Sequence, residues 1–157
     1  MMHSNTQIYK VKSDKISGEN YIDVERVARQ AYRIIAGRTK RNPYIRSAYF
    51  HKDKIFLSLF WQHLMQKHEG DRKRRLRYFN CAIELLRHST IPPETKQNPL
   101  NKNELLHRFT GQTIHGDIFI VHIAEDKRKG NKFLISVFPP KQQDRTSQVK
   151  TKKPRKW

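Results

Sequence analysis

Two short patterns in this chain hold the residue types that phosphodiester chemistry requires. The first pairs His63 with Lys67, four residues apart in a segment of helical periodicity, which would place a proton carrier and a cation on one side of a helix. The second places Ser136 in an otherwise apolar run, with Phe138 two residues later and so on the same face of a strand. A hydroxyl there can bond a phosphate and a ring can stack on a base. The alternative interpretations are a boundary histidine beside a solvated lysine, and a serine bonded to neighbouring backbone.

Further polar residues are candidates for contacts with a phosphate. Alternation along a predicted strand places Arg108 and Thr110 on one face and His107 on the other. Arg108 would suit either a phosphate or a surface salt bridge, and His107 is either a substrate contact or a hydrogen-bonded core histidine. Arg75 belongs to a basic run over 72–77, and Lys96 lies in a loop bounded by prolines. Both are also consistent with solvated surface positions.

Other catalytic chemistries lack their residues in this sequence. Acidic residues are few, and Asp117, Glu125 and Asp126 fall in one strand and its following turn, so they need not converge on Mg²⁺. The histidine spacing does not fit a zinc site, and Cys81 is the one cysteine. Neither a glycine-rich phosphate loop nor a nucleophile elbow occurs. The sequence therefore favours chemistry without metal or cofactor, in which the RNA 2′-hydroxyl is the nucleophile.

The charge of the chain favours a polyanionic partner. Lys and Arg total 33 against 14 Asp and Glu, which gives a formal net charge of +19. Residues 139–157 contribute +6 and residues 1–138 contribute +13, so most of the charge belongs to the expected folded part. We predict one domain over 1–138 and a basic, disordered tail over 139–157. The absence of a signal-like apolar run predicts a cytoplasmic protein with no membrane partner.

The periodicity predicts an α+β domain in which N-terminal helices pack on an antiparallel β-sheet. Apolar residues at helical spacing predict helices over 21–37, 59–67 and 71–88. Asn20 is the expected N-cap of the first helix. Apolar runs with short connections predict an antiparallel meander of strands over 105–112, 117–124 and 132–138. A strand over 7–11, a hairpin over 45–57 and a loop over 90–102 complete the prediction.

Four segments resemble toxin-like ribonucleases of bacteria and phages. These segments are FWQHLMQKH, RRLRYFNCAIELLR, LHRFTGQT and KFLISVFP, and the resemblance covers residues 50–139. The group is the barnase–EndoU–colicin–RelE-like family, in particular its phage-associated branch. The resemblance implies N-terminal helices on an antiparallel sheet and metal-independent cleavage of RNA, often tRNA or mRNA. It also implies a Lys/His cluster before the sheet, which Lys67 with His68, or His63, would supply here, and His63 is the favoured acid–base residue. It further implies a late-strand serine followed by an aromatic residue, which is Phe138 here where such a member has Trp.

Residues and resemblance together predict a metal-independent endoribonuclease that needs no cofactor. The expected catalytic residues are His63, Lys67, Arg108 and Ser136. The expected substrate-binding residues are Arg75, Lys96, His107, Thr110 and Phe138. Expected partners are RNA, with tRNA as one candidate, and an acidic antitoxin or immunity protein. A non-catalytic RNA- or DNA-binding module and the interacting half of a toxin–antitoxin pair are the competing hypotheses.

Overall fold

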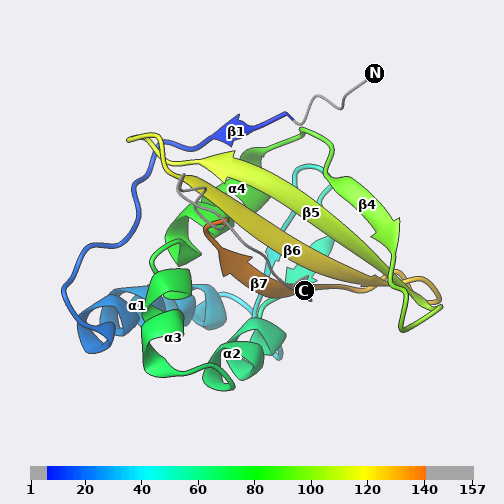
Figure 1. The fold of residues 1–157 in the computed structure, drawn as a ribbon. Helices are drawn as coiled ribbons and strands as arrows, with labels where there is room; N and C mark the ends of the chain where they lie inside the picture. The colour runs from blue at the N-terminus through cyan, green and yellow to red at the C-terminus, as the bar shows by residue number, and fades with distance from the viewer. Residues whose placement is uncertain (1–6, 141–157) are drawn as a thin grey trace.

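A computed structural model describes residues 7–140, and the tail predicted over 139–157 lies outside them apart from Pro139 and Pro140. The described chain forms a seven-stranded sheet in the order β1-β5-β6-β7-β3-β2, with β4 also paired to β5 (Figure 1). The strands are β1 (Tyr9–Lys10), β2 (Tyr44–Arg46), β3 (Lys54–Phe56), β4 (Glu94–Gln97), β5 (Glu104–Gln112), β6 (Ile118–Asp126) and β7 (Lys132–Phe138).

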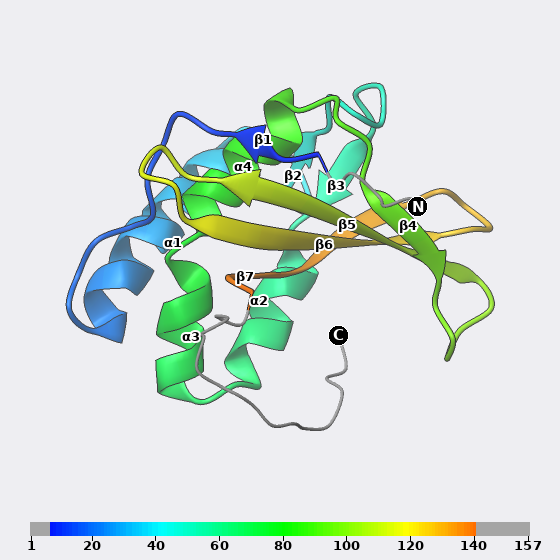
Figure 2. The same cartoon turned by 45° about the horizontal axis from the view of Figure 1, so that its top comes forward.

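The α+β class is confirmed, but the prediction of a wholly antiparallel sheet is wrong. The meander β5-β6-β7 is antiparallel, as its short turns require, and β2-β3 is an antiparallel hairpin. In contrast, β1 pairs with β5 and β3 pairs with β7 in parallel. Long stretches of chain separate the members of these two pairs, so no tight turn fixes their direction. The result is a mixed sheet, whose long β5 and β6 strands cross the molecule in Figure 2.

The helices are α1 (Tyr21–Gly37), α2 (Ser58–Met65), α3 (Glu69–Leu76) and α4 (Phe79–His88). Asn20 caps α1 as predicted, because its side chain accepts from the backbone N–H of Asp23 at 3.1 Å. The single helix predicted over 71–88 is wrong, because the chain breaks between Leu76 and Phe79. At the break, the Arg77 carbonyl accepts from the backbone N–H of Ile16 at 2.8 Å instead of continuing a helical ladder.

Residues 94–97, predicted as loop, form the edge strand β4 against β5. All four of its side chains are exposed, so no alternation of apolar residues marks it as a strand. Together with β1, it borders the edge of β5 that faces away from β6.

One face of the sheet carries the hydrophobic core. Phe109, Val121 and Leu134 on the strands join Leu85 of α4 and Phe60 of α2 in one buried cluster. We call the opposite surface the outer face. It presents side chains from the even-numbered positions of β4, β5 and β6, together with Phe133, Ser136 and Phe138 of β7. Among residues 7–140, every helix is too short or too polar to traverse a bilayer.

Candidate functional site

Three polar residues from neighbouring strands form one row across the outer face. Arg108 of β5 pairs with His122 of β6, which pairs with Ser136 of β7. The Arg108 Nε–H donates to His122 Nε2 at 3.3 Å, and His122 Nδ1 lies 3.5 Å from Ser136 Oγ. Side chains opposite each other on paired strands are in reach of one another, so the sheet itself holds this row together.

The imidazole of His122 is neutral in this environment. The side chain is almost completely buried, with 1% of the residue exposed. Burial lowers the pKa of His122, and the charges of Arg108, Arg75 and Lys96 lower it further, to about 3. Because Nε2 accepts from Arg108, the single ring proton of the neutral imidazole is assigned to Nδ1, which then donates toward Ser136.

This protonation fixes what Ser136 can do. Its oxygen accepts from His122 Nδ1–H, so its own hydroxyl hydrogen is left to donate to another group. His122 cannot act as a base toward Ser136, because one ring nitrogen holds a proton and the other accepts from Arg108. The pair therefore does not suit a serine nucleophile. It suits a hydroxyl that is held in place to donate to an acceptor such as a phosphate oxygen.

Further cations and an aromatic ring surround this row. Arg75 of α3 lies over the Phe138 ring, with its guanidinium carbon 5.2 Å from the ring centroid. The edge of the same ring meets His122, with the centroids 5.1 Å apart. Lys96 of β4 occupies an outer-face position beside Leu106, and its charge reaches His122. We call Arg75, Lys96, Arg108, His122 and Ser136 the cationic cluster.

An acid on α3, Asp71, orients Arg75. Asp71 accepts from Arg75 Nε at 3.1 Å and from Arg74 at 3.1 Å on the same helix. Burial would raise the pKa of Asp71, but the two guanidiniums outweigh burial and hold that pKa below its usual value. Asp71 is therefore a carboxylate that fixes the direction of Arg75 across the end of β7.

The other cations of the basic run over 72–77 have structural contacts. Arg72 donates to two carbonyls at the end of α2, at 2.7 and 3.0 Å. Lys73 donates to the carbonyl of Glu19, and Arg77 donates to two carbonyls of the segment before α1. Arg74 reaches the carbonyl of Pro139 at 3.4 Å. Within this run, Arg75 is thus the residue directed at the outer face.

The structure brings six of the predicted site residues to one face. Arg75, Lys96, Arg108 and Ser136 belong to the cationic cluster, and Phe138 lies against it. Thr110 occupies the next outer-face position of β5, in the row that includes Ile120 and Phe138.

The prediction that His63 and Lys67 lie on one helix is wrong. Helix α2 ends at Met65, so Lys67 lies beyond it and not on a shared helix face with His63. Arg72 donates to the carbonyls of Met65 and Lys67, at and just beyond the end of the helix. His63 is half-buried on α2, which packs against β7. Its side chain makes no hydrogen bond or ion pair with another residue of 7–140.

His107 lies on the core face and does not join the cluster. It is 5% exposed, with Nδ1 2.8 Å from Thr95 Oγ1 and Nε2 2.8 Å from Glu125 Oε1. Lys132 extends this network, because its ammonium bonds Asp53 at 2.9 Å and lies 3.8 Å from Glu125. Of the two interpretations, the hydrogen-bonded core histidine describes this position.

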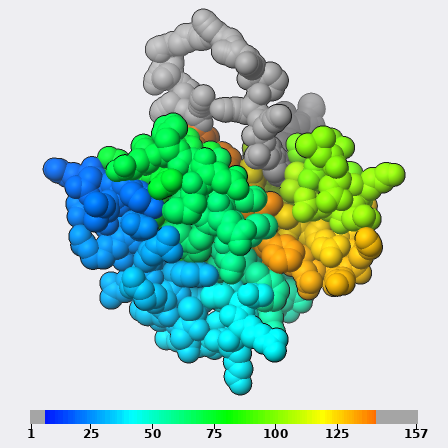
Figure 3. Space-filling model, turned by 90° about the horizontal axis from the view of Figure 1, so that it is seen from below, coloured from blue at the N-terminus to red at the C-terminus, as the bar shows by residue number. Residues whose placement is uncertain are grey.

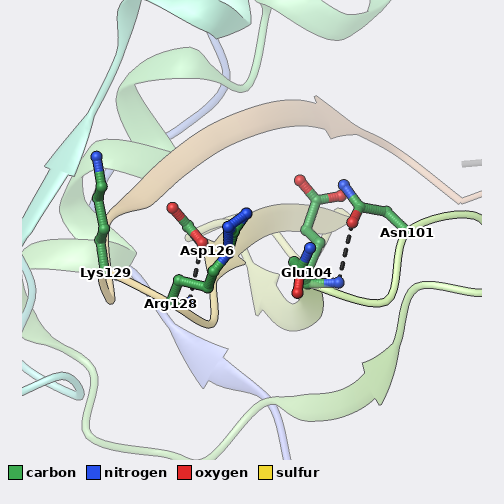
Figure 4. Close-up of a pocket in the computed structure, with 6 residues that line it drawn as sticks. Asn101, Glu104, Asp126, Arg128 and Lys129 are labelled. Carbon is green, nitrogen blue, oxygen red and sulfur yellow. Dashed lines mark hydrogen bonds between the residues drawn. The ribbon is translucent and has the colours of Figure 1, made fainter.

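A polar pocket of about 480 Å³ lies where the β4–β5 loop meets the β6–β7 turn (Figure 4). Its carboxylates are bonded to the loops, since Glu104 accepts from Asn98 at 2.7 Å and Asp126 accepts from the Arg128 backbone at 3.0 Å. Its lining mixes two acids with Arg128 and Lys129, so it does not favour a phosphate. Within residues 7–140, no three His, Cys, Asp or Glu side chains are grouped to hold a metal ion.

Comparison of the chain with family models, with curated proteins and with solved structures gives no match. The site is therefore interpreted from its own geometry. His122 is the member that sequence reasoning missed, because a histidine in an apolar strand suggests a structural role. The signal that could have identified it is the hairpin turn at 113–117, which sets Arg108 opposite His122.

Proposed function

We propose that this protein is a metal-independent, toxin-like endoribonuclease whose substrate phosphate binds at the cationic cluster. The observation that supports the proposal is the convergence of Arg75, Lys96 and Arg108 around His122, which itself contacts Ser136 on the same face of the sheet. Three cations near one hydroxyl donor suit a group whose negative charge increases during the reaction. The phosphorane formed when RNA attacks its own phosphate is such a group.

In the proposed reaction, RNA supplies the nucleophile. A base removes the proton of the 2′-hydroxyl, the 2′-oxygen attacks phosphorus, and the bond from phosphorus to the 5′-oxygen breaks as that oxygen takes a proton. The products are a 2′,3′-cyclic phosphate and a 5′-hydroxyl. Ser136 donates to a phosphate oxygen, and the cluster cations offset the added charge. His122 acts through Ser136 as a positioning residue, because it is buried and neutral.

His63 is the proposed proton carrier. It is partly exposed on α2, the helix that packs against β7. As a neutral imidazole it accepts the 2′-hydroxyl proton, and as an imidazolium it returns a proton to the 5′-oxygen. Lys67, just beyond α2, is proposed to hold substrate phosphate from the same side.

The test is cleavage of end-labelled total RNA in the presence of EDTA. We expect discrete fragments that end in a cyclic phosphate. Ser136→Ala and Arg75→Gln should each slow cleavage about 100-fold, and His63→Ala should slow it at least as much. Arg33→Gln is the matched control, because Arg33 is an exposed cation on α1. Loss of cleavage in EDTA, or full activity of His63→Ala, would rule out this mechanism.

A non-catalytic RNA-binding module is the second candidate. The absence of a bond between the His63 side chain and any other residue of 7–140 favours it, since a binding module needs no oriented imidazole. In that case labelled RNA would be retained by the protein but recovered intact, and Arg75→Gln would weaken retention.

An acidic antitoxin or immunity protein is the proposed protein partner, because it would match the charge of the same cluster. Coexpression with the products of neighbouring genes tests this part. Relief of growth inhibition by one acidic protein is the expected result.

A further inference from the structure

Beside the cationic cluster, a second row of side chains crosses the outer face. Tyr44 of β2 pairs with Phe56 of β3, Phe56 pairs with Phe133 of β7, and Phe133 pairs with Ala124 of β6. Ala124 in turn pairs with Leu106 of β5. The three rings are thus side by side at the β2 edge of the sheet, and two aliphatic residues continue the row to β5. We call Tyr44, Phe56 and Phe133 the aromatic row.

The aromatic row is not part of the hydrophobic core. All three rings are partly exposed, and none belongs to the buried cluster or to the partly buried residues that pack against it. Tyr49 and Phe50, in the turn between β2 and β3, do pack against that cluster. In the row, the Tyr44 and Phe56 centroids are 6.0 Å apart and those of Phe56 and Phe133 are 5.9 Å apart. Core packing therefore does not explain three adjacent rings on this face.

Two exposed cations flank the outermost ring. Lys54 Nζ lies 4.6 Å from the Tyr44 ring centroid, and the Arg46 guanidinium lies 5.4 Å from it. Arg46 and Lys54 are themselves partners across β2 and β3, at the edge of the sheet. Rings interleaved with exposed cations are the composition of surfaces that bind single-stranded nucleic acid, where bases stack and cations hold phosphates.

The aromatic row lies next to the cationic cluster. On β6, Ala124 is two residues from His122, which places the rows about 7 Å apart on one face. On β7, Phe133 precedes Ser136 by three residues. The space-filling view in Figure 3 shows orange residues of β7 and its preceding turn at the surface between the green helices and the lime segment that holds β4. A strand of RNA with one phosphate at the cluster therefore has the aromatic row directly alongside.

We propose that Tyr44, Phe56 and Phe133 form a stacking path for bases of single-stranded RNA that flank the phosphate at the cationic cluster. This inference rests on the proposed function for its choice of RNA. It adds that the substrate is unpaired over the nucleotides beside the reacting phosphate, because a paired base has no face to offer the rings. Arg46 and Lys54 would hold the backbone where it leaves the sheet at β2.

Binding measurements test the path without relying on cleavage. The probes are a fluorescein-labelled oligouridylate with 2′-O-methyl groups, which cannot undergo 2′-hydroxyl attack, and a blunt RNA duplex of equal length. Tyr44→Leu and Phe133→Leu keep apolar surface but remove a ring, and each should weaken oligouridylate binding about 5- to 100-fold. Duplex binding should change less than twofold. Tyr32→Leu is the matched control, because Tyr32 is a partly exposed ring on α1, where it packs on Trp61 of α2. Thermal melts confirm that each variant is folded.

Each outcome separates this inference from the proposed function. Unchanged oligouridylate affinity in both ring variants would overturn the stacking path, whether or not the wild-type protein cleaves RNA. Equal loss of duplex and oligouridylate binding would also overturn it, since rings that stack on unpaired bases do not act on a duplex. If the ring variants lose only oligouridylate binding and the wild-type protein does not cleave RNA, the stacking path is supported and the ribonuclease proposal is refuted.

Discussion

At the scale of single residues, His122 has the most unusual environment in the candidate site. Its ring nitrogens lie within reach of the Arg108 guanidinium and the neutral hydroxyl of Ser136, and the charges of three cations act on it. The arrangement is stable because the imidazole stays uncharged and accepts from Arg108. A charged imidazolium at this position would be desolvated and repelled by Arg108, Arg75 and Lys96.

The low pKa of His122 predicts how the stability of the protein depends on pH. Burial, aided by three neighbouring cations, lowers the pKa of His122 in the folded protein to about 3, whereas in the unfolded chain its pKa is near the ordinary value of 6.5. Between these values the unfolded chain binds a proton that the folded chain does not, so the free energy of unfolding rises as pH rises through this window. The contribution reaches at most about 5 kcal/mol and is fully present above pH ~7.

Urea denaturation at a series of pH values checks this prediction. The curve of unfolding free energy against pH should be flatter between pH 3 and 6.5 in His122→Gln than in the wild type. His51→Gln, which replaces an exposed histidine, should keep the wild-type slope. An unchanged slope in His122→Gln would contradict a depressed pKa.

At the scale of elements, one extra residue in β7 determines which residues meet in the site. The register shifts between His122 and Ile123, so that Ser136 pairs with His122 while Leu134 pairs with Ile123. Ile135 is the residue left over. If the pairing of Glu125 with Lys132 continued without this bulge, His122 would face Ile135 and Ser136 would point into the core. The bulge therefore aligns Ser136 with His122.

The strands of the meander were predictable from the sequence, whereas the bulge in β7 was not. The three strands of the meander lie within two residues of their predicted bounds, because their apolar runs and turns are local signals. The pairing of Arg108 with His122 follows from the length of the turn between β5 and β6, so it could have been predicted from the sequence. The alignment of Ser136 was not predictable, because neighbouring β-branched residues give no sign of which one is left unpaired.

Three other features depend on tertiary contacts that local sequence does not encode. The break at Arg77 requires the segment before α1 to supply a partner. The carbonyls at and beyond the end of α2 accept from Arg72, which folds back onto them. The parallel pairing of β1 and β3 requires the whole sheet to be assembled. Arg75 could be named as a candidate from the sequence, but only the fold shows that its neighbours in the basic run are used for structure.

The packing of α4 on β5 gives a prediction at the same scale. Gly111 faces the core, and a Cβ there would lie against the Phe119 ring and 2.7 Å from Leu85 Cδ1. Gly111→Ala should therefore destabilise the protein by about 1–3 kcal/mol. Gly37→Ala at the end of α1, where no atom lies within 4 Å of the new methyl, should be neutral or stabilise by up to about 1 kcal/mol. Chemical denaturation of both variants measures the contrast, and equal stabilities would contradict the close approach of α4.

At the scale of the whole molecule, the cations behind the net charge of +19 are not equivalent. Many cations are used by the fold, such as Lys132 beside Asp53 and Arg29 beside Glu25. The cationic cluster and the Arg46–Lys54 pair differ because they lie on the outer face, beside the aromatic row. A polyanion would therefore be oriented by particular positions on one face, although the total charge would speed its approach from any direction.

Salt dependence distinguishes such oriented binding from general attraction. Each phosphate contact to single-stranded RNA contributes about 0.7 to the slope of log affinity against log salt concentration. Lys96→Gln should reduce the slope of oligouridylate binding by about this amount, because Lys96 lies at the cationic cluster. Arg33→Gln removes the same charge from α1 and should leave the slope nearly unchanged. Fluorescence anisotropy titrations over a range of KCl concentrations give both slopes. Equal changes in slope in the two variants would contradict a phosphate bound at the cluster. They would mean that RNA binding depends on net charge alone.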